Sequence, residues 1–186
     1  GFGYWLLKFD GGTTPNFGNK DNPQGIGNIE YAYYLMAKDC GIEMTECRLL
    51  PEGDSHHFMT KRFDRTETGE KIHVQTLAGI AIMTATKGTH TKKRSDHACD
   101  ETELSATGTI VPENVFNVMS RNHDDHTKNY SFLMDKDGSW SLAPAYDLCY
   151  SYTPGGKWTN RHQLSLNGNK TTSLTKTLLP LPGIWG

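Results

Sequence analysis

The sequence predicts an α+β fold in which a small β lobe precedes a mainly helical lobe. Three observations predict this division. Residues 1–83 hold four strand-like runs and one amphipathic helix, and residues 84–111 are mostly polar. Residues 112–186 begin with a short apolar helix and continue through a dense polar loop into a β-hairpin. At 186 residues the chain is long enough for one sizeable core divided between two lobes.

Hydrophobic periodicity predicts the elements of the first lobe. A helix is expected at residues 28–40, with an apolar stripe at helical spacing, Asn28 as its N-cap and Gly41 as its stop. A further helix is expected to begin within residues 77–85. The expected strands are apolar or alternating runs bounded by turn residues, at positions 4–9, 47–50, 56–63 and 71–75.

A polar loop at residues 122–129 lies between a short helix and a β-hairpin. The helix is expected at residues 112–120, because Pro112 suits the first helical position and apolar residues supply a buried side. The hairpin strands are expected at 130–134 and 139–142, joined by Asp-Lys-Asp-Gly, since Asp and Gly tolerate the positive φ of a tight turn. The chain then runs through Pro144 to an acidic residue at position 147.

The order of Asp124, Asn129 and Asp147 is that of a protein kinase catalytic loop. In kinases an Asp-x-x-x-x-Asn loop supplies the base that accepts the proton of the attacking hydroxyl and an amide that holds Mg²⁺, and a later Asp bridges metal and phosphates. One carboxylate, one amide oxygen and phosphate oxygens suit Mg²⁺, a hard cation that keeps its waters. The usual Asp-Phe-Gly is replaced here by Asp-Leu-Cys.

Lys8 is the one cation in the otherwise apolar first strand. A lone buried ammonium is costly, so Lys8 either meets a carboxylate or extends along the strand edge into water. Glu30 is the candidate partner, as in the Lys–Glu pair that kinases hold at the ATP phosphates. Its position in the first turn of the expected helix also suits the helix dipole without any such pair. Both interpretations stay open on the sequence.

Composition argues against several other classes of protein. The net charge is −2, with 19 Lys and Arg against 21 Asp and Glu, so bulk charge does not favour direct nucleic-acid binding. No run approaches the roughly 20 apolar residues of a membrane span, and we expect no secretory signal. Four cysteines without a Cys-x-x-Cys pair favour free thiols in a reducing compartment. We therefore expect a cytoplasmic protein.

Three motifs resemble the HipA serine/threonine kinases, the toxins of bacterial toxin–antitoxin pairs. They are Lys-Arg-Phe-Asp-Arg at 61–65, Asn-x-Asp-Asp-His-x-Lys-Asn at 122–129 and Leu-Ala-Pro-Ala-Tyr-Asp-Leu at 142–148. Val-Phe-Asn-Val at 115–118 and His-Gln-Leu-Ser-Leu-Asn-Gly at 162–168 are also similar to that family. The resemblance covers roughly residues 4–82 and 112–168.

The resemblance implies a protein kinase-like fold with a mixed five-stranded small lobe and a helical large lobe. It implies that ATP and Mg²⁺ are used to phosphorylate a protein hydroxyl, with Asp124 as the general base and Asn129 and Asp147 as metal ligands. Lys8 is expected to contact phosphate. The backbone of residues 61–63 is expected to contact the adenine, and Asp64 is expected to contact the ribose. The implied nucleotide-binding residues are Lys8, Lys61, Phe63, Asp64, His126 and Lys128.

The resemblance also implies partners. Members of the family phosphorylate aminoacyl-tRNA synthetases and are held in check by a DNA-binding HipB-type antitoxin. They carry an upstream domain with a phosphate-binding loop and a regulatory serine, and further helices after the region that matches Leu166. The chain is therefore expected to be an incomplete C-terminal portion with a truncated large lobe, whose partner is an upstream domain or a second chain. Residues 84–111 stand where the family has an amphipathic helix.

Two other interpretations stay open. Without the phosphate-binding loop, the chain is a non-catalytic kinase-like module or one half of a split kinase, because phosphoryl transfer depends mainly on positioning and charge stabilisation. Alternatively, a His/Asp cluster is the metal site of a phosphohydrolase, since imidazole and carboxylate suit metals that make hydroxide near neutral pH. The hairpin between Asn129 and Asp147 argues against such a site, because these metal sites usually project from helices. The cluster comprises His56, His57, His123, Asp124, Asp125, His126 and Asp147.

Overall fold

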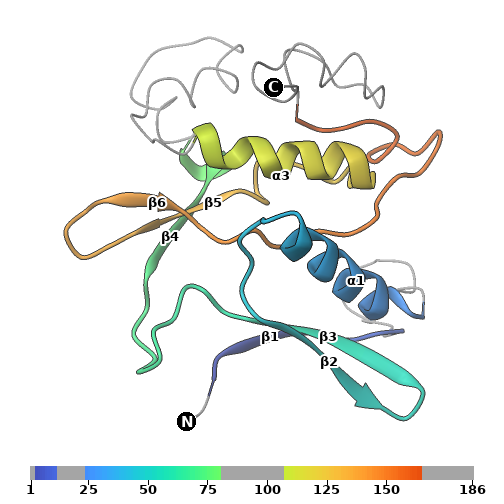
Figure 1. Ribbon diagram of the computed structural model, residues 1–186, viewed down its shortest axis with the longest axis horizontal. Coiled ribbons are helices and arrows are strands. Elements are labelled where there is room, and N and C mark those ends of the chain that lie inside the picture. Colours follow the sequence, from blue (N-terminus) through green and yellow to red (C-terminus); the bar gives the residue numbers. More distant parts are fainter. Residues whose placement is uncertain (1–2, 12–23, 81–106, 165–186) are drawn as a thin grey trace.

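The computed structural model describes residues 3–11, 24–80 and 107–164, and within them two antiparallel sheets and two long helices (Figure 1). The first sheet has the order β1-β3-β2 and contains β1 (Trp5–Lys8), β2 (Cys47–Glu52) and β3 (Ser55–Lys61). The second has the order β4-β5-β6 and contains β4 (His73–Thr76), β5 (Ser131–Met134) and β6 (Trp140–Leu142). The helices are α1 (Ile26–Asp39) and α3 (Thr107–Ser120).

The end of α1 confirms the sequence prediction. The helix lies over β2 and β3 (Figure 1). Gly41 follows it with a φ of 75°, which glycine adopts without a steric penalty. The N–H groups of Gly41 and Ile42 donate to the carbonyls of Lys38 and Ala37 at 3.0 and 2.9 Å. This Schellman arrangement satisfies carbonyls that the last turn leaves unpaired, so the predicted stop at Gly41 is correct.

The start of α1 differs from the prediction. The helix begins at Ile26, with Gly25 and not Asn28 at its N-cap. The carboxylate of Asp10, which follows β1, accepts the N–H of Gly25 at 2.8 and 3.0 Å. The amide N–H groups at this helix end, first that of Gly25, hold the pKa of Asp10 below its ordinary value. The carboxylate of Asp10, which is distant in sequence, therefore accepts a hydrogen bond at the N-terminus of α1, where the N-cap rule predicts Asn28.

The first turn of α1 approaches β3 closely. A Cβ at Gly27 would lie 2.2 Å from the carbonyl oxygen of His56, so no larger residue fits there without movement of the backbone. Because α1 begins at Ile26, Glu30 lies in the second turn of the helix and not in its first. This position removes the simple helix-dipole interpretation of Glu30.

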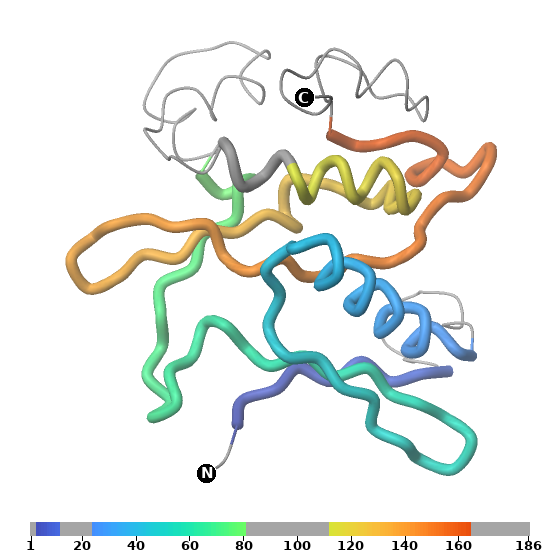
Figure 2. Tube along the Cα trace, viewed as in Figure 1, coloured from blue at the N-terminus to red at the C-terminus, as the bar shows by residue number. Residues whose placement is uncertain are grey.

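The fourth strand and the second helix also differ from the prediction. β4 pairs with β5, with Val74 opposite Leu133, and Figure 2 shows its green segment beside the orange hairpin. The part of the first sheet that the structure describes is three-stranded and antiparallel, in place of the five-stranded mixed sheet. α3 begins at Thr107, so Pro112 lies inside the helix and not at its first position. A proline inside a helix removes one backbone hydrogen bond, and Phe116, about one turn later, packs into the core.

One hydrophobic core joins the two halves of the chain. Its buried residues come from both helices, from the connection after α1 and from the segment after β6; they are Tyr33, Ala37, Ile42, Phe116, Ala145 and Leu148. Met44 and Ala145 form an isolated parallel bridge, in which the N–H of Ala145 donates to the carbonyl of Glu43 at 2.8 Å. This bridge holds the chain that leads to Asp147 against the connection between α1 and β2.

Several predictions lie outside the described residues. These are the polar insert over 84–106, residues 81–85 of the helix expected at 77–85, and the tail from residue 165 onward. Residues 77–80 are helical. The division of the chain at residues 83 and 111 stays a prediction. No helix in the described ranges is long and apolar enough to cross a bilayer.

Candidate active site

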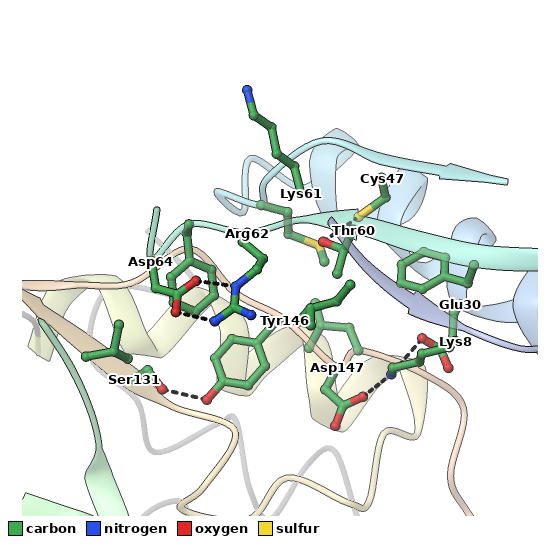
Figure 3. A pocket seen from close by; sticks show the side chains of 16 residues that line it. Lys8, Glu30, Cys47, Thr60, Lys61, Arg62, Asp64, Ser131, Tyr146 and Asp147 are labelled. Carbon is green, nitrogen blue, oxygen red and sulfur yellow. Dashed lines mark hydrogen bonds and ion pairs between the residues drawn. The ribbon is translucent and has the colours of Figure 1, made fainter. Parts of the chain in front are cut away.

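A cavity of about 360 Å³ lies between the first sheet and the segment after β6 (Figure 3). Its walls are mainly apolar and come from five strands, from α1 and from the chain after β3 and after β6; they include Leu6, Phe58, Val74 and Leu148. Three charged side chains, Lys8, Glu30 and Asp147, stand together in it. An apolar slot with a group of charges in it suits a ligand with a planar apolar part and a charged part.

Lys8 joins two acids that are far apart in the sequence. Its Nζ lies 2.9 Å from Oε2 of Glu30 and forms a second ion pair with Asp147. The predicted pair with Glu30 is therefore confirmed. Partial burial alone would lower the pKa of Lys8, but the carboxylates of Asp147 and Glu30 outweigh it and raise that pKa. Burial raises the pKa of Glu30, although the charge of Lys8 opposes this.

Asp147 has a backbone conformation that few non-glycine residues adopt. Its φ is 60°, in the left-handed region, which costs on the order of 1–3 kcal/mol. The residues before it are fixed, because the hydroxyl of Tyr146 donates to the carbonyl of Lys128 at 2.6 Å and the N–H of Ala145 donates to Glu43. The strained turn brings the Asp147 carboxylate to Lys8.

Residues 61–64 line another wall of the cavity. The N–H groups of Lys61 and Arg62 donate to the carbonyls of Glu46 and Tyr4, each at 2.8 Å, so both are already paired. Figure 3 shows the ammonium of Lys61 pointing away from the cavity. Within the described ranges the N–H of Phe63 has no backbone partner. Of the predicted adenine-binding segment, Phe63 therefore offers the free donor.

The carboxylate of Asp64 is held by two arginines. Arg62 donates to both of its oxygens, at 2.7 and 2.6 Å, and Arg65 donates to Oδ2 at 2.6 Å. The hydrogen bonds from Arg62 hold the pKa of Asp64 below its ordinary value. The predicted contact of Asp64 with a ribose would have to share an acceptor with these guanidinium groups. Arg62, which also lines the cavity, was expected to offer only its backbone to the nucleotide, so a role for its guanidinium is not part of the sequence-based site.

The loop after α3 places Asp124 and Asn129 together. Nδ2 of Asn129 donates to the backbone carbonyl of Asp124 at 2.9 Å, which leaves the amide oxygen of Asn129 as the atom that could accept the metal expected from the sequence. His126 lies beside the predicted base, with Nε2 at 3.8 Å from Oδ1 of Asp124. Lys128 is exposed and contributes its carbonyl to Tyr146. None of these four loop residues is among those that line the cavity.

The pKa of Asp124 is raised, first by partial burial and then by the nearby charges of Asp147 and Asp125, while His126 opposes the shift. A carboxylate with a raised pKa accepts a proton more readily than an ordinary one. The electrostatics of Asp124 therefore suit the role of a general base.

Two residues beside this loop are absent from the sequence-based site. Nδ1 of His162 lies 2.9 Å from Oδ2 of Asp125, and Nε2 of Gln163 donates to Oδ1 of Asp124 at 3.0 Å. The signal for them in the sequence is the motif at 162–168, which says nothing of contacts with the loop. Asp125 itself faces His162 and not the cavity.

The His/Asp cluster expected for a phosphohydrolase does not converge. The ring of His123 contacts the carbonyl of Thr159, Asp125 contacts His162, and His57 contacts Glu52 at the far end of the first sheet. In the residues that the structure describes, no group of three or more His, Cys, Asp or Glu side chains could hold a metal ion.

The metal ligands expected from the sequence, Asn129 and Asp147, would supply one amide oxygen and one carboxylate. These hard oxygen ligands fit Mg²⁺, which is usually held by one or two carboxylates together with phosphate oxygens and water. The carboxylate of Asp147 is half exposed although it is paired with Lys8. Because it is half exposed, it is accessible to such an ion.

Comparisons with known proteins identify the family to which this chain is similar. Residues 1–180 match the family described as HipA-like C-terminal domain. A curated protein of Sinorhizobium fredii named Putative kinase Y4dM is 26% identical over 149 residues, which are 67% of this chain and 34% of that protein.

Two solved structures share the fold. HipA of Shewanella oneidensis MR-1, in a complex with HipB and its operator DNA, has a TM-score of 0.60 at 18% identity and covers 90% of this chain and 42% of its own. The proinflammatory kinase CtkA of Helicobacter pylori has a TM-score of 0.58 at 16% identity and covers 77% of this chain and 50% of its own. The predicted kinase-like fold is thus confirmed in its general form. The chain spans half or less of the length of these relatives.

Proposed function

This chain belongs to the family of HipA-like C-terminal domains, a kinase family, and on that premise we propose that it carries the ATP site and the catalytic loop of a serine/threonine protein kinase. One observation carries the proposal. Lys8 bridges Glu30 and Asp147 beside an apolar cavity, although 139 residues separate Lys8 from Asp147. Phosphoryl transfer needs this combination of a held cation, a metal-binding acid and a base close by.

Each residue of the site has a separate task in the proposed reaction. The adenine enters the apolar cavity and meets the N–H of Phe63, and Lys8 contacts the phosphates while Glu30 holds its ammonium in place. Asn129 and Asp147 would hold Mg²⁺, which would supply positive charge to neutralise the phosphates. The substrate hydroxyl gives its proton to Asp124 as its oxygen bonds to the γ-phosphorus. The bond from that phosphorus to the bridging oxygen breaks, and ADP leaves.

The partners proposed for this chain follow from its family. The Shewanella HipA structure contains HipB and operator DNA, so a HipB-like antitoxin is the proposed regulatory partner, and the chain is proposed to act as part of a toxin–antitoxin pair. An upstream domain or a second chain is proposed to complete the phosphate site. An aminoacyl-tRNA synthetase is the proposed substrate class, and the cytoplasm is the proposed location.

Transfer of labelled phosphate from ATP to protein tests this function. We expect Mg²⁺-dependent, alkali-labile phosphate on serine or threonine of the chain or of an added synthetase mixture. Asp54→Asn, in the exposed turn between β2 and β3, is the matched control for Asp124→Asn and should transfer phosphate as the unmodified chain does. Nucleotide binding without any transfer would favour the non-catalytic alternative and contradict the kinase proposal for this chain.

A further inference from the structure

Residues 159–163 close on the catalytic loop through four hydrogen bonds. The carbonyl of Thr159 contacts Nδ1 of His123 at 3.2 Å, and Nδ1 of His162 contacts Oδ2 of Asp125 at 2.9 Å. The remaining two come from Gln163. Its backbone N–H donates to Oδ1 of Asp125 at 2.7 Å, and its side-chain amide donates to Oδ1 of Asp124 at 3.0 Å.

Asp125 and His162 form a buried anchor under these contacts. The exposed fractions of Asp125 and His162 are 4% and 3%, and the adjacent ring of His123 is fully buried, 4.2 Å from that of His162. A buried carboxylate is stable only when its oxygens are paired, and here one oxygen contacts an imidazole and the other an amide N–H. Displacing residue 163 would leave this carboxylate short of a partner, so the anchor fixes the backbone of Gln163.

The fixed backbone aims the side chain of Gln163 at the predicted base. Its amide binds one oxygen of Asp124, while Ser151 accepts the backbone N–H of Asp124 at 2.9 Å and Asn129 donates to its carbonyl. Asp124 is therefore held at its backbone on both sides and at one carboxylate oxygen. A carboxylate held by one oxygen presents the other in a defined direction, which proton transfer requires.

We propose that Gln163 is a positioning residue that sets the orientation of the Asp124 carboxylate, and that the buried Asp125–His162 pair holds Gln163 in place. The inference rests on the proposed function for the role of Asp124 as base. It assigns a task to Asp125, the acid next to the base, that involves neither proton transfer nor metal binding.

Gln163→Met tests the proposal, because methionine keeps the length of the side chain and removes its donor. Its backbone N–H remains, so the bond to Asp125 and the fold are retained. We expect kcat of phosphoryl transfer to fall by about 10- to 100-fold with the KM for ATP unchanged, as expected when a reacting group is misplaced. The matched control is Arg161→Ala, an exposed neighbour in the same segment, which should leave kcat unchanged.

A double-mutant cycle separates positioning from general destabilisation. If Gln163 acts through Asp124, Gln163→Met should change the residual rate of an Asp124→Asn chain by less than about twofold, because interacting residues are not additive. An equal loss in both backgrounds would overturn the proposal.

Crystal structures of the unmodified chain and of Gln163→Met provide a readout that does not depend on activity. We expect the carboxylate of Asp124 to rotate in the variant while Asp125 and His162 keep their contact. An unchanged Asp124 rotamer would refute the positioning role. A chain that transfers no phosphate but shows the rotation would count against the proposed function alone.

Discussion

Replacing Asp124 by Asn should lower the rate of phosphoryl transfer by about 10²- to 10⁴-fold and leave ATP affinity nearly unchanged. Asparagine keeps the shape of the side chain, and its oxygen can still accept the hydrogen bond from Gln163. It cannot accept the proton of the attacking hydroxyl, so only the chemical step is lost. The measurement is kcat together with the dissociation constant of ATP from calorimetry.

The partially buried position of Asp124 makes this substitution informative. Its raised pKa already favours proton acceptance, and the amide removes that capacity without adding a new charge beside Asp147. A fully active Asp124→Asn chain would contradict the assignment of the base, whereas loss of ATP binding would indicate that Asp124 belongs to the nucleotide site.

Replacing Glu113 by Gln should stabilise the protein in alkaline solution. Glu113 is buried in α3, with 4% of its surface exposed, and this burial raises the pKa of its carboxyl from 4.5 to about 8. Between these values the unfolded chain has released a proton that the folded chain retains, so stability falls as pH rises from about 4.5 to about 8. At about 1.4 kcal/mol for each pKa unit, the loss is on the order of a few kcal/mol.

The Gln variant removes this pH-dependent loss, because an amide does not ionise. The free energy of unfolding, measured by urea titration, should exceed that of the unmodified chain by a few kcal/mol at pH 9 and differ little at pH 4. Glu67→Gln, at an exposed position, is the control and should show no such pH dependence. An equal effect of Glu113→Gln at both pH values would show that the carboxyl does not carry a raised pKa.

Local chemistry in the sequence was sufficient for several features of the site. The cation in an apolar strand and the acid on the next helix made the Lys8–Glu30 pair one of two open interpretations, because a buried ammonium requires a carboxylate, and the structure shows that pair. Gly41 marked the end of α1 correctly. The hairpin turn also follows its residues, since Oδ1 of Asp135 accepts the N–H groups of Asp137 and Ser139.

Features that depend on distant contacts could not be predicted in this way. The N-cap rule selects Asn28, but the carboxylate of Asp10 reaches the helix end from the segment after β1. Strand periodicity predicted β4 without its partner, because a strand's own residues do not specify which edge it joins. The contact of Gln163 with Asp124 joins residues 39 positions apart, and no spacing rule connects them.

Calorimetric titration of the chain with ATP, with and without Mg²⁺, tests the central claim most directly. If Lys8, Asn129 and Asp147 form a nucleotide site, ATP should bind more tightly with Mg²⁺, and Asp147→Asn should remove the difference. No binding of ATP in either condition, or a metal dependence unchanged by Asp147→Asn, would contradict the assignment of this cleft.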